Sequence, residues 1–285
     1  MTSLNATEIA AEIAADTATD TATDIRPVAS LRVRGQGRRV VGALMLREMS
    51  TTYGRSPGGY IWAVIEPVGM IAMMAMVFSM ALRAPSLGTN FLLFYAGGYL
   101  PLRFFQQFSK SVGTAVKFNQ ALMTYPRVTI FDTVAARALL VILTQIMVTA
   151  VITAGIFAIG DIREHIEFGP ILRAYGACIV LAFGIGTFNC YMLIRFAVWK
   201  SIWSILTRPL LLISGVFYIY EDLPRVAQNI LWYNPLIHVS GGVRSGIYST
   251  YDPQYISLLY VCMVGIIPMT FGALLLWRYG RDMLN

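Results

Sequence analysis

Six apolar stretches, each long enough to cross a bilayer as a helix, decide what this chain can fold into. They cover residues 60–82, 91–108, 130–159, 171–194, 203–219 and 256–277. A membrane-spanning helix needs about 20 predominantly apolar residues. Of the whole chain, 56% is hydrophobic and only 13% is charged, whereas soluble domains carry about 25% charged residues. The sequence therefore predicts an all-α integral membrane protein with about six transmembrane helices.

A basic, amphipathic segment over residues 38–56 precedes the first apolar stretch. On a helix, its apolar residues share one face: Val40, Val41, Leu44, Met45 and Met49. Its cations occupy the other faces: Arg38, Arg39, Arg47 and Arg55. This pattern is typical of a helix that lies in the headgroup region of an anionic leaflet. We expect the chain to turn at Gly58 and Gly59 from this interfacial helix into the first span.

The first 30 residues have a different composition. Residues 1–24 are acidic, rich in alanine and threonine, and contain the repeat DTATDTATD. They lack the basic start and apolar core of a signal peptide. We predict a disordered tail over 1–30, with a short helix as the alternative, followed by one transmembrane domain over 31–285.

Arginine and lysine gather in four segments: before the first predicted span, between the second and third, between the fourth and fifth, and after the last. Loops rich in these residues remain in the cytoplasm. Both termini are therefore predicted to be cytoplasmic, and the net charge of +7 is mainly a signal of topology.

Motifs that carry chemistry are missing from the sequence. It contains no GxxxxGK[ST] loop, no HExxH and no nucleophile elbow. Cys178, Cys190 and Cys262 lie in predicted spans at no metal-binding spacing, which favours small buried side chains. We predict no catalytic residue and no metal site, so a partner must supply the energy for any active process.

The connection over residues 117–128 is the candidate place where that partner docks. Its apolar side chains Phe118, Leu122 and Tyr125 suit a pocket on a soluble protein. An ordinary loop, anchored at the headgroups by Tyr125, is the alternative.

Residues 220–252 form a second unusual region, which we predict to be re-entrant on the periplasmic side. Pro224, Pro235, Pro253 and the pair Gly241-Gly242 forbid one continuous span, so short helices that enter the outer leaflet fit best. Aromatic residues are concentrated here: Tyr218, Tyr220, Trp232, Tyr233, Tyr248 and Tyr251. An aromatic belt at the membrane surface and ring faces that stack on sugars both explain them.

Arg137 lies about two turns into the third predicted span. An unpaired cation costs about 2.5–3.5 kcal/mol at the centre of a bilayer, so we predict a structural ion pair between Arg137 and Glu66. Snorkelling to the headgroups and contact with a substrate are the alternatives. Asp132 and Thr133 are expected to cap the start of this span.

Several short motifs, in this order along the chain, resemble those of the ABC-2 type permeases that export capsular polysaccharide, the KpsM-like group. The motifs are Leu46-Arg47-Glu48, Tyr53-Gly54, Gly59-Tyr60, Trp62-Ala63, Glu66-Pro67, Asn119-Gln120 with Leu122 and Tyr125, Asp132-Thr133, Ala136-Arg137-Ala138-Leu139-Leu140, and Trp232-Tyr233-Asn234-Pro235-Leu236 with His238. The likeness covers roughly residues 40–281 and leaves the tail outside.

The resemblance implies a transport subunit of the bacterial inner membrane that is not itself an enzyme. Two copies would form the pathway, and two copies of a separate ATP-binding subunit would hold ATP and Mg²⁺, so this chain would bind no cofactor. A periplasmic adaptor, an outer-membrane polysaccharide channel and a lipid-linked acidic polysaccharide complete the implied partners. The residues expected to couple to the ATPase are Lys117, Phe118, Asn119, Gln120, Leu122, Tyr125, Arg47 and Glu48.

Residue type and position select candidates for the substrate pathway. They are Arg47, Arg55, Tyr60, Trp62, Tyr218, Tyr220, Trp232, Tyr233 and Asn234. Guanidinium groups bind the phosphate of a lipid-linked acceptor in a bidentate manner, although holding the helix on anionic lipid is the simpler role. Rival functions are export of O-antigen, teichoic acid or another amphipathic substrate, a membrane-embedded transferase that acts on lipid-linked sugars, and an ion-coupled carrier.

Overall fold

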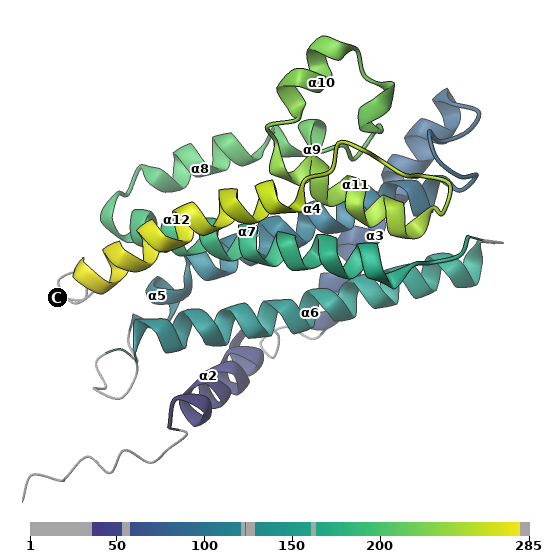
Figure 1. Ribbon diagram of the computed structural model, residues 1–285. Coiled ribbons are helices and arrows are strands. Elements are labelled where there is room, and N and C mark those ends of the chain that lie inside the picture. Colours follow the sequence, from purple (N-terminus) through teal and green to yellow (C-terminus); the bar gives the residue numbers. More distant parts are fainter. Residues whose placement is uncertain (1–35, 53–57, 121–122, 124–128, 161–163, 280–285) are drawn as a thin grey trace, which may run out of the picture. The chain divides into compact units, whose positions relative to one another are not determined.

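The computed structural model describes residues 36–52, 58–120, 123, 129–160 and 164–279, and in these ranges the chain forms helices and no strand (Figure 1). By its contacts the chain divides into two units, residues 1–39 and 40–285, and the account below concerns the second. The predicted tail over 1–30 lies outside the described residues.

The helices follow one another along the chain without long interruptions. They are α2 (Gln36–Thr52), α3 (Gly59–Ala81), α4 (Phe91–Gly113), α5 (Ala115–Phe118), α6 (Ile130–Ile159), α7 (Phe168–Arg195), α8 (Trp199–Thr207), α9 (Leu210–Ile213), the 3₁₀ turn η2 (Tyr220–Asp222), α10 (Arg225–Leu231), α11 (Pro235–Ile247) and α12 (Leu258–Tyr279). The prediction of an all-α protein is confirmed.

Four helices of the described chain are long and apolar enough to cross a membrane: α3 from Ile61, α6, α7 and α12. Four of the predicted spans correspond to them within a few residues. The second predicted span forms α4, which has 23 residues but carries Arg103, Gln107 and Lys110 and is more polar. The count of six spans stays a prediction.

The fifth predicted span, 203–219, was wrong as a single helix. The chain forms α8 and the short α9 instead, separated at Arg208 and Pro209. Proline lacks the N–H that would continue the hydrogen-bond ladder of α8. Beyond α9, Gly215 takes a φ of 71°, a left-handed conformation that suits glycine and ends the helical path.

The starts of two spans follow local rules. Gly58 has a φ of 88° at the N-cap of α3, as expected for a turn at the glycine pair. Helix α6 begins with a capping box: the Thr129 hydroxyl accepts from the Asp132 N–H at 3.2 Å, and the Asp132 carboxylate accepts from the Thr129 N–H at 3.1 Å. Asp132 thus caps the span as predicted, with Thr129 rather than Thr133 as its companion.

The core lies around α4 and α7. Helix α7 packs closely against α12 and against α4, which also contacts α3, α6 and α11. The backbones of α7 and α12 are almost in contact, because a Cβ built on Gly184 would lie 1.8 Å from the Gly265 carbonyl oxygen. Small residues permit such close packing between helices in a membrane.

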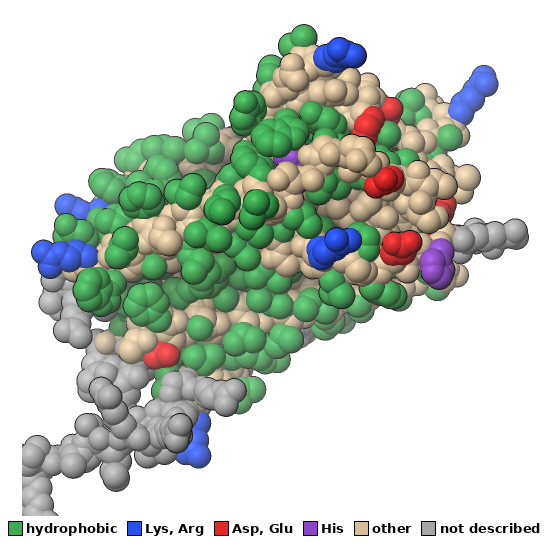
Figure 2. Space-filling view, viewed as in Figure 1, with side chains coloured by type: hydrophobic (Ala, Val, Ile, Leu, Met, Phe, Trp, Pro, Cys, Tyr) green, Lys and Arg blue, Asp and Glu red, His purple; other side chains and the backbone are tan. Residues whose placement is uncertain are grey.

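Apolar side chains cover the exposed faces of the long helices. Met80 on α3, Leu259 on α12 and Trp277 on α12 are 85%, 70% and 74% exposed. Figure 2 shows hydrophobic side chains over α12, α8 and α6, and charged side chains mostly toward the ends of these helices. Such a surface fits the hydrocarbon of a bilayer.

The region 220–252 contains η2, α10 and α11, all shorter than a span. Asn234 caps α11, since its side-chain oxygen accepts from the Leu236 N–H at 3.1 Å, and Pro235 occupies the first helical position. The short helices expected here are present, and the depth of this region in the membrane stays a prediction.

Candidate functional site

The amphipathic pattern of α2 matches how its side chains are covered. Val40, Val41, Met45 and Met49 are half-buried and Leu44 is buried, whereas Arg39 and Arg47 are exposed. The same face also buries Glu48, which is only 5% exposed. A carboxylate on the apolar face of a basic helix requires a cationic partner.

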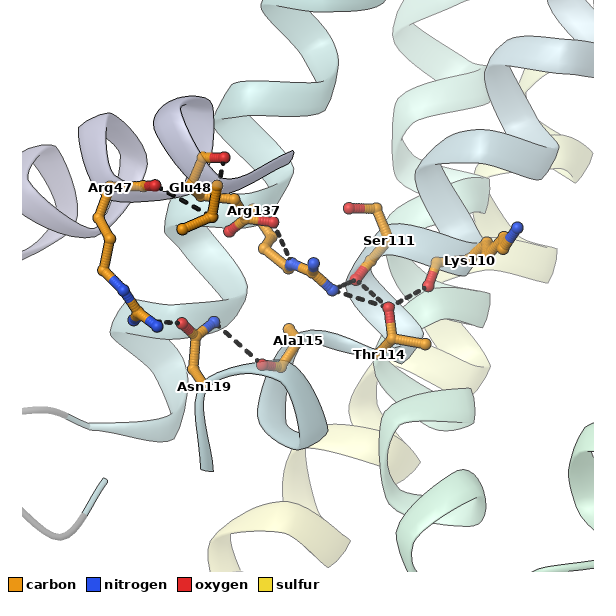
Figure 3. Close-up of polar contacts among 9 residues, drawn as sticks. Arg47, Glu48, Lys110, Ser111, Thr114, Ala115, Asn119 and Arg137 are labelled. Carbon is orange, nitrogen blue, oxygen red and sulfur yellow. Dashed lines mark hydrogen bonds and ion pairs between the residues drawn. The ribbon is translucent and has the colours of Figure 1, made fainter. Parts of the chain in front are cut away.

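That partner is Arg137 of α6 (Figure 3). Its Nε donates to the Glu48 carboxylate, and its Nη1 donates to the Thr114 hydroxyl at 2.7 Å and the Ser111 carbonyl at 3.2 Å. The guanidinium carbon also lies 4.2 Å from the centre of the Phe118 ring, within the range of a cation–π contact. One side chain of α6 therefore holds α2, the end of α4 and α5.

A second link joins α2 to the end of α5. Arg47 donates from Nη1 to the side-chain oxygen of Asn119 at 3.4 Å, and the Asn119 amide nitrogen donates to the Ala115 carbonyl at 3.1 Å. Asn119 is 3% exposed. We call Arg47, Glu48, Ser111, Thr114, Phe118, Asn119 and Arg137 the charged junction.

The pair at the centre of the charged junction is closed to solvent. The side chains of Arg137 and Glu48 are 9% and 6% exposed. Removing one member of a buried pair leaves a charge without compensation, at a cost of about 3–5 kcal/mol. The junction therefore connects α2, the end of α4 and α5 to the long helix α6 through polar contacts and one cation–π contact.

The predicted pair between Glu66 and Arg137 was wrong, because each has another partner. The Glu66 carboxylate accepts hydrogen bonds from both terminal nitrogens of Arg103, a residue of α4, at 2.9 and 2.8 Å. The sequence-based choice took the nearest acid in the first span. The acid on the interfacial helix was closer in space.

The residues expected to couple to an ATPase divide into two groups. Lys117, Gln120, Arg47 and Phe118 are exposed at the surface of the junction. Glu48 and Asn119 are buried and bonded within the chain, so they position their neighbours and do not face a partner. Leu122 and Tyr125 lie outside the described residues.

Sequence reasoning missed Glu48 as the partner of Arg137, although a signal was available. Glu48 lies one turn after Leu44 on the apolar face of α2. A carboxylate on such a face indicates a cationic partner, because burial without one is costly. It also missed Arg103, a cation within the second predicted span. Ser111 and Thr114 gave no signal, because polar residues are common at the end of a helix.

Aromatic side chains of the predicted re-entrant region pack against those of the segment that follows it. Tyr220 stacks on Tyr255 with centroids 4.1 Å apart, and Trp232 stacks on Tyr260 at 5.1 Å. The Trp232 ring N–H donates to the Tyr255 carbonyl at 3.3 Å. We call Tyr220, Trp232, His238, Tyr255 and Tyr260 the aromatic cluster.

His238 is fully buried at the centre of the aromatic cluster. Its Nδ1 accepts from the Ser257 N–H at 3.3 Å, so its Nε2 carries the proton and donates to the Trp232 carbonyl at 2.8 Å. Burial lowers the pKa of His238 below its usual range. The imidazole is therefore a neutral clamp between α10, α11 and the start of α12.

A buried cation that the sequence did not reveal lies beside this region. Arg244 of α11 is 2% exposed and donates to the carbonyls of Gly215 at 2.6 Å, Tyr218 at 2.8 Å and Val216 at 2.9 Å. These carbonyls belong to the turn after α9, where the helical ladder ends. Arg244 thus satisfies the backbone groups that the broken fifth span leaves without partners.

The pathway candidates also divide by exposure. Trp62 and Tyr233 are 67% and 69% exposed, and Tyr218 is partly exposed. The rings of Tyr220 and Trp232 are occupied within the aromatic cluster, and Asn234 caps α11 and donates to the Ile213 carbonyl at 2.8 Å. Arg55 and the side chain of Tyr60 lie outside the described part.

The metal-ligating side chains of the described ranges are scattered. Among those residues, no three His, Cys, Asp or Glu side chains lie together in a way that would hold a metal ion. Cys178 and Cys190 are buried single thiols and Cys262 is half-buried. The charged junction holds helices together and presents an exposed surface at Arg47 and Phe118.

Comparison with known proteins gives this geometry a context. Residues 39–248 match the family described as ABC-2 type transporter. Capsule polysaccharide export inner-membrane protein CtrC of Neisseria meningitidis serogroup B (strain ATCC BAA-335 / MC58) is 28% identical over 245 residues, which is 86% of this chain and 92% of CtrC.

Two further relatives align over similar lengths. Polysialic acid transport protein KpsM of Escherichia coli is 29% identical over 233 residues, 81% of this chain and 90% of the relative. Capsule polysaccharide export inner-membrane protein BexB of Haemophilus influenzae is 27% identical over 253 residues, 88% and 94% of the two chains. The family match, over residues 39–248, includes every residue of the charged junction.

Proposed function

Since the chain belongs to the ABC-2 type transporter family, we propose that it is the permease subunit of an ATP-driven exporter that moves a capsule-type polysaccharide across the bacterial inner membrane. The names of CtrC and BexB support this cargo and this location, and the name of KpsM supports transport of an acidic polysaccharide. The apolar surfaces of the long helices support a multi-pass membrane protein.

The charged junction is the observation that carries the mechanism. An ATP-binding subunit that docks on its exposed side would meet Lys117, Gln120 and Arg47. Closure of that subunit on ATP and Mg²⁺ would push on α2 and α5, and the Glu48–Arg137 pair would transmit the push to α6. The permease itself contributes no group to ATP hydrolysis.

The assembly that we propose contains two copies of this chain and two ATP-binding subunits. The lipid-linked polysaccharide would pass between the two permease copies. A periplasmic adaptor and an outer-membrane channel would receive it. A wide hydrated path is needed, because sugar hydroxyls lose their hydrogen bonds in hydrocarbon.

The first test is co-expression with the ABC ATP-binding protein encoded nearest to this chain. We expect the two to co-purify through a tag on the permease and to show vanadate-sensitive ATPase activity. A folded permease that captures no such ATPase in repeated trials would overturn the proposal.

A charge reversal tests where the ATPase docks. Lys117→Glu should lower the yield of co-purified ATPase at least fivefold, whereas Arg225→Glu, an exposed cation on α10, should leave it unchanged. Equal yields for both variants would remove Lys117, and with it the exposed surface of α5 beside the charged junction, from the docking surface.

A further inference from the structure

An ion pair is exposed on the side of a membrane-spanning helix. Glu66 lies about two turns into α3, within a stretch apolar enough to span the membrane, yet its side chain is 60% exposed. Its partner Arg103 is 15% exposed and binds both carboxylate oxygens, at 2.9 and 2.8 Å. Bidentate pairing stabilises the charges, but a charged group that faces hydrocarbon remains costly.

The neighbouring helix α4 extends this polar surface. Arg103, Gln107 and Lys110 are spaced four and three residues apart, so they share one face of α4. Gln107 and Lys110 are exposed, while Phe104 and Phe108 on the other side of α4 are buried in the core. We call Glu66, Arg103, Gln107 and Lys110 the polar strip.

The other end of α3 provides the contrast. Met73, Met76, Val77 and Met80 are 53%, 67%, 56% and 85% exposed and wholly apolar, as expected for a helix in contact with lipid. Glu66 is thus a charged side chain on an otherwise apolar exposed surface, which also includes Ile61, Trp62 and Ile65. An exposed charge avoids the cost of hydrocarbon where it faces water, so the proposal below requires the polar strip to be hydrated.

We propose that the polar strip is a binding site for the anionic groups, carboxylate or phosphate, of the polysaccharide during its passage. This inference rests on the proposed function for the source of the anion. The strip carries two cations and one anion, so its net charge favours an acidic polymer. The guanidinium of Arg103 matches carboxylate and phosphate equally well.

In the absence of a polymer, the Glu66 carboxylate pairs with the guanidinium of Arg103 and holds it in position. An arriving anionic group replaces the Glu66 carboxylate, which turns to water because it is already 60% exposed. No bond other than hydrogen bonds and ionic contacts changes. Lys110, two turns further along α4, offers the next contact about 10 Å away.

Cysteine labelling tests whether the polar strip is hydrated, independently of transport. In a background without Cys178, Cys190 and Cys262, membrane fragments open on both sides are treated with a charged, membrane-impermeant maleimide. Gln107→Cys should react at least tenfold faster than Met76→Cys, whose position is exposed on the apolar part of α3. Equally slow labelling would place the strip against lipid and overturn the proposal.

Protection from labelling tests the ligand. The Gln107→Cys permease in phosphatidylcholine nanodiscs is labelled in the presence of a uronic acid oligomer or a neutral dextran oligomer of the same length. The acidic oligomer should slow labelling at least threefold and the neutral one should not. The protection should be lost in the double variant Glu66→Gln with Arg103→Gln, which removes both charges of the ion pair.

The outcomes separate this proposal from the proposed function, since neither assay needs an ATPase or export. Failure of the acidic oligomer to protect would overturn the anion site even if the permease captures its ATPase. Protection by phosphatidylglycerol in the nanodisc, without any effect of the oligomer, would assign the site to a lipid headgroup and overturn binding of the polymer.

Discussion

The charged junction and the aromatic cluster both join helices that are distant in sequence, but they do so with different chemistry. The junction connects α2, α4, α5 and α6 through one buried ion pair and several charged hydrogen bonds. The cluster connects α10, α11 and α12 through stacked rings and a neutral histidine. The first has exposed cations at its edge, whereas most rings of the second contact one another.

The difference bears on how each region would respond to the proposed ATP-binding partner. Charged side chains at the edge of the junction would form new contacts with a docking protein, and the buried pair would transmit its position because few other arrangements satisfy both charges. Stacked rings offer no comparable contact and favour one arrangement. We therefore expect the junction to move during transport and the cluster to serve as a fixed anchor.

The largest effect should come from removing one member of the buried pair. Glu48→Gln leaves Arg137 without its carboxylate and should lower stability by about 3–5 kcal/mol. Arg137→Gln should do the same. The measurement is the midpoint of thermal unfolding in detergent, together with the amount of permease in the membrane.

The double variant is the matched control. Glu48→Gln with Arg137→Gln leaves two neutral groups that still bond to each other, so it should regain at least half of the lost stability. Additive losses would mean that the two residues do not interact as the structure shows.

A smaller loss of folding stability is expected for a substitution in the aromatic cluster. Trp232→Leu keeps an apolar side chain but loses the stack on Tyr260 and the hydrogen bond to the Tyr255 carbonyl, which should cost about 2 kcal/mol. Once the variant is folded, its ATPase activity per complex should equal that of the parent. A folded Trp232→Leu permease that no longer stimulates the ATPase would contradict the role of anchor.

Much of the fold could be predicted because spans obey simple rules. The bounds of α6 agree with the predicted stretch, since apolar length and an acidic residue in the first turn both act locally. The interruption of the fifth span depended on Pro209 and on a cation, Arg244, that lies 29 residues beyond Gly215 and binds its carbonyl. Such a distant partner leaves no trace in a hydropathy pattern.

The candidate site was only partly predictable for the same reason. The sequence identified Arg137 as a residue in need of a partner, and burial of the charge makes that requirement general. Choosing Glu48 over Glu66 required knowing which helix lies beside α6. The sequence also could not show that the rings of Tyr220 and Trp232 stack on other rings of the chain.

Acid should weaken the aromatic cluster. The pKa of His238 in the folded chain lies below its usual value because the ring is buried. The unfolded chain therefore binds a proton at His238 before the folded chain does. The contribution of neutral His238 to folding stability is fully present above about pH 6.5, the ordinary pKa of histidine. This contribution is lost as the pH falls from there toward the lower pKa of the folded chain.

The check is the unfolding midpoint in detergent at pH 7.5 and pH 5.5. Each unit of pKa depression contributes about 1.4 kcal/mol to the loss. His238→Gln should reduce the pH dependence, whereas His165→Gln, at an exposed position, should leave it as in the parent. An unchanged pH dependence in His238→Gln would assign the effect to other groups.

The smallest effect on stability, with a clear effect on coupling, is expected for Arg47. Its side chain is exposed and its contact with Asn119 is long, at 3.4 Å, so Arg47→Gln should cost less than about 1 kcal/mol. If the edge of the charged junction receives the ATPase, the same variant should lower stimulated ATPase activity severalfold while the unfolding midpoint stays within a degree or two. Arg39→Gln, at another exposed position about two turns earlier on α2, is the control and should change neither the ATPase activity nor the unfolding midpoint.

Stability and coupling are measured on one preparation. A fall in the unfolding midpoint in proportion to the loss of ATPase activity would mean that Arg47 serves the packing of α2 alone. A loss of stimulated ATPase activity at an unchanged midpoint would instead be the opposite of the result expected for Trp232→Leu, and would assign coupling to the charged junction and anchoring to the aromatic cluster.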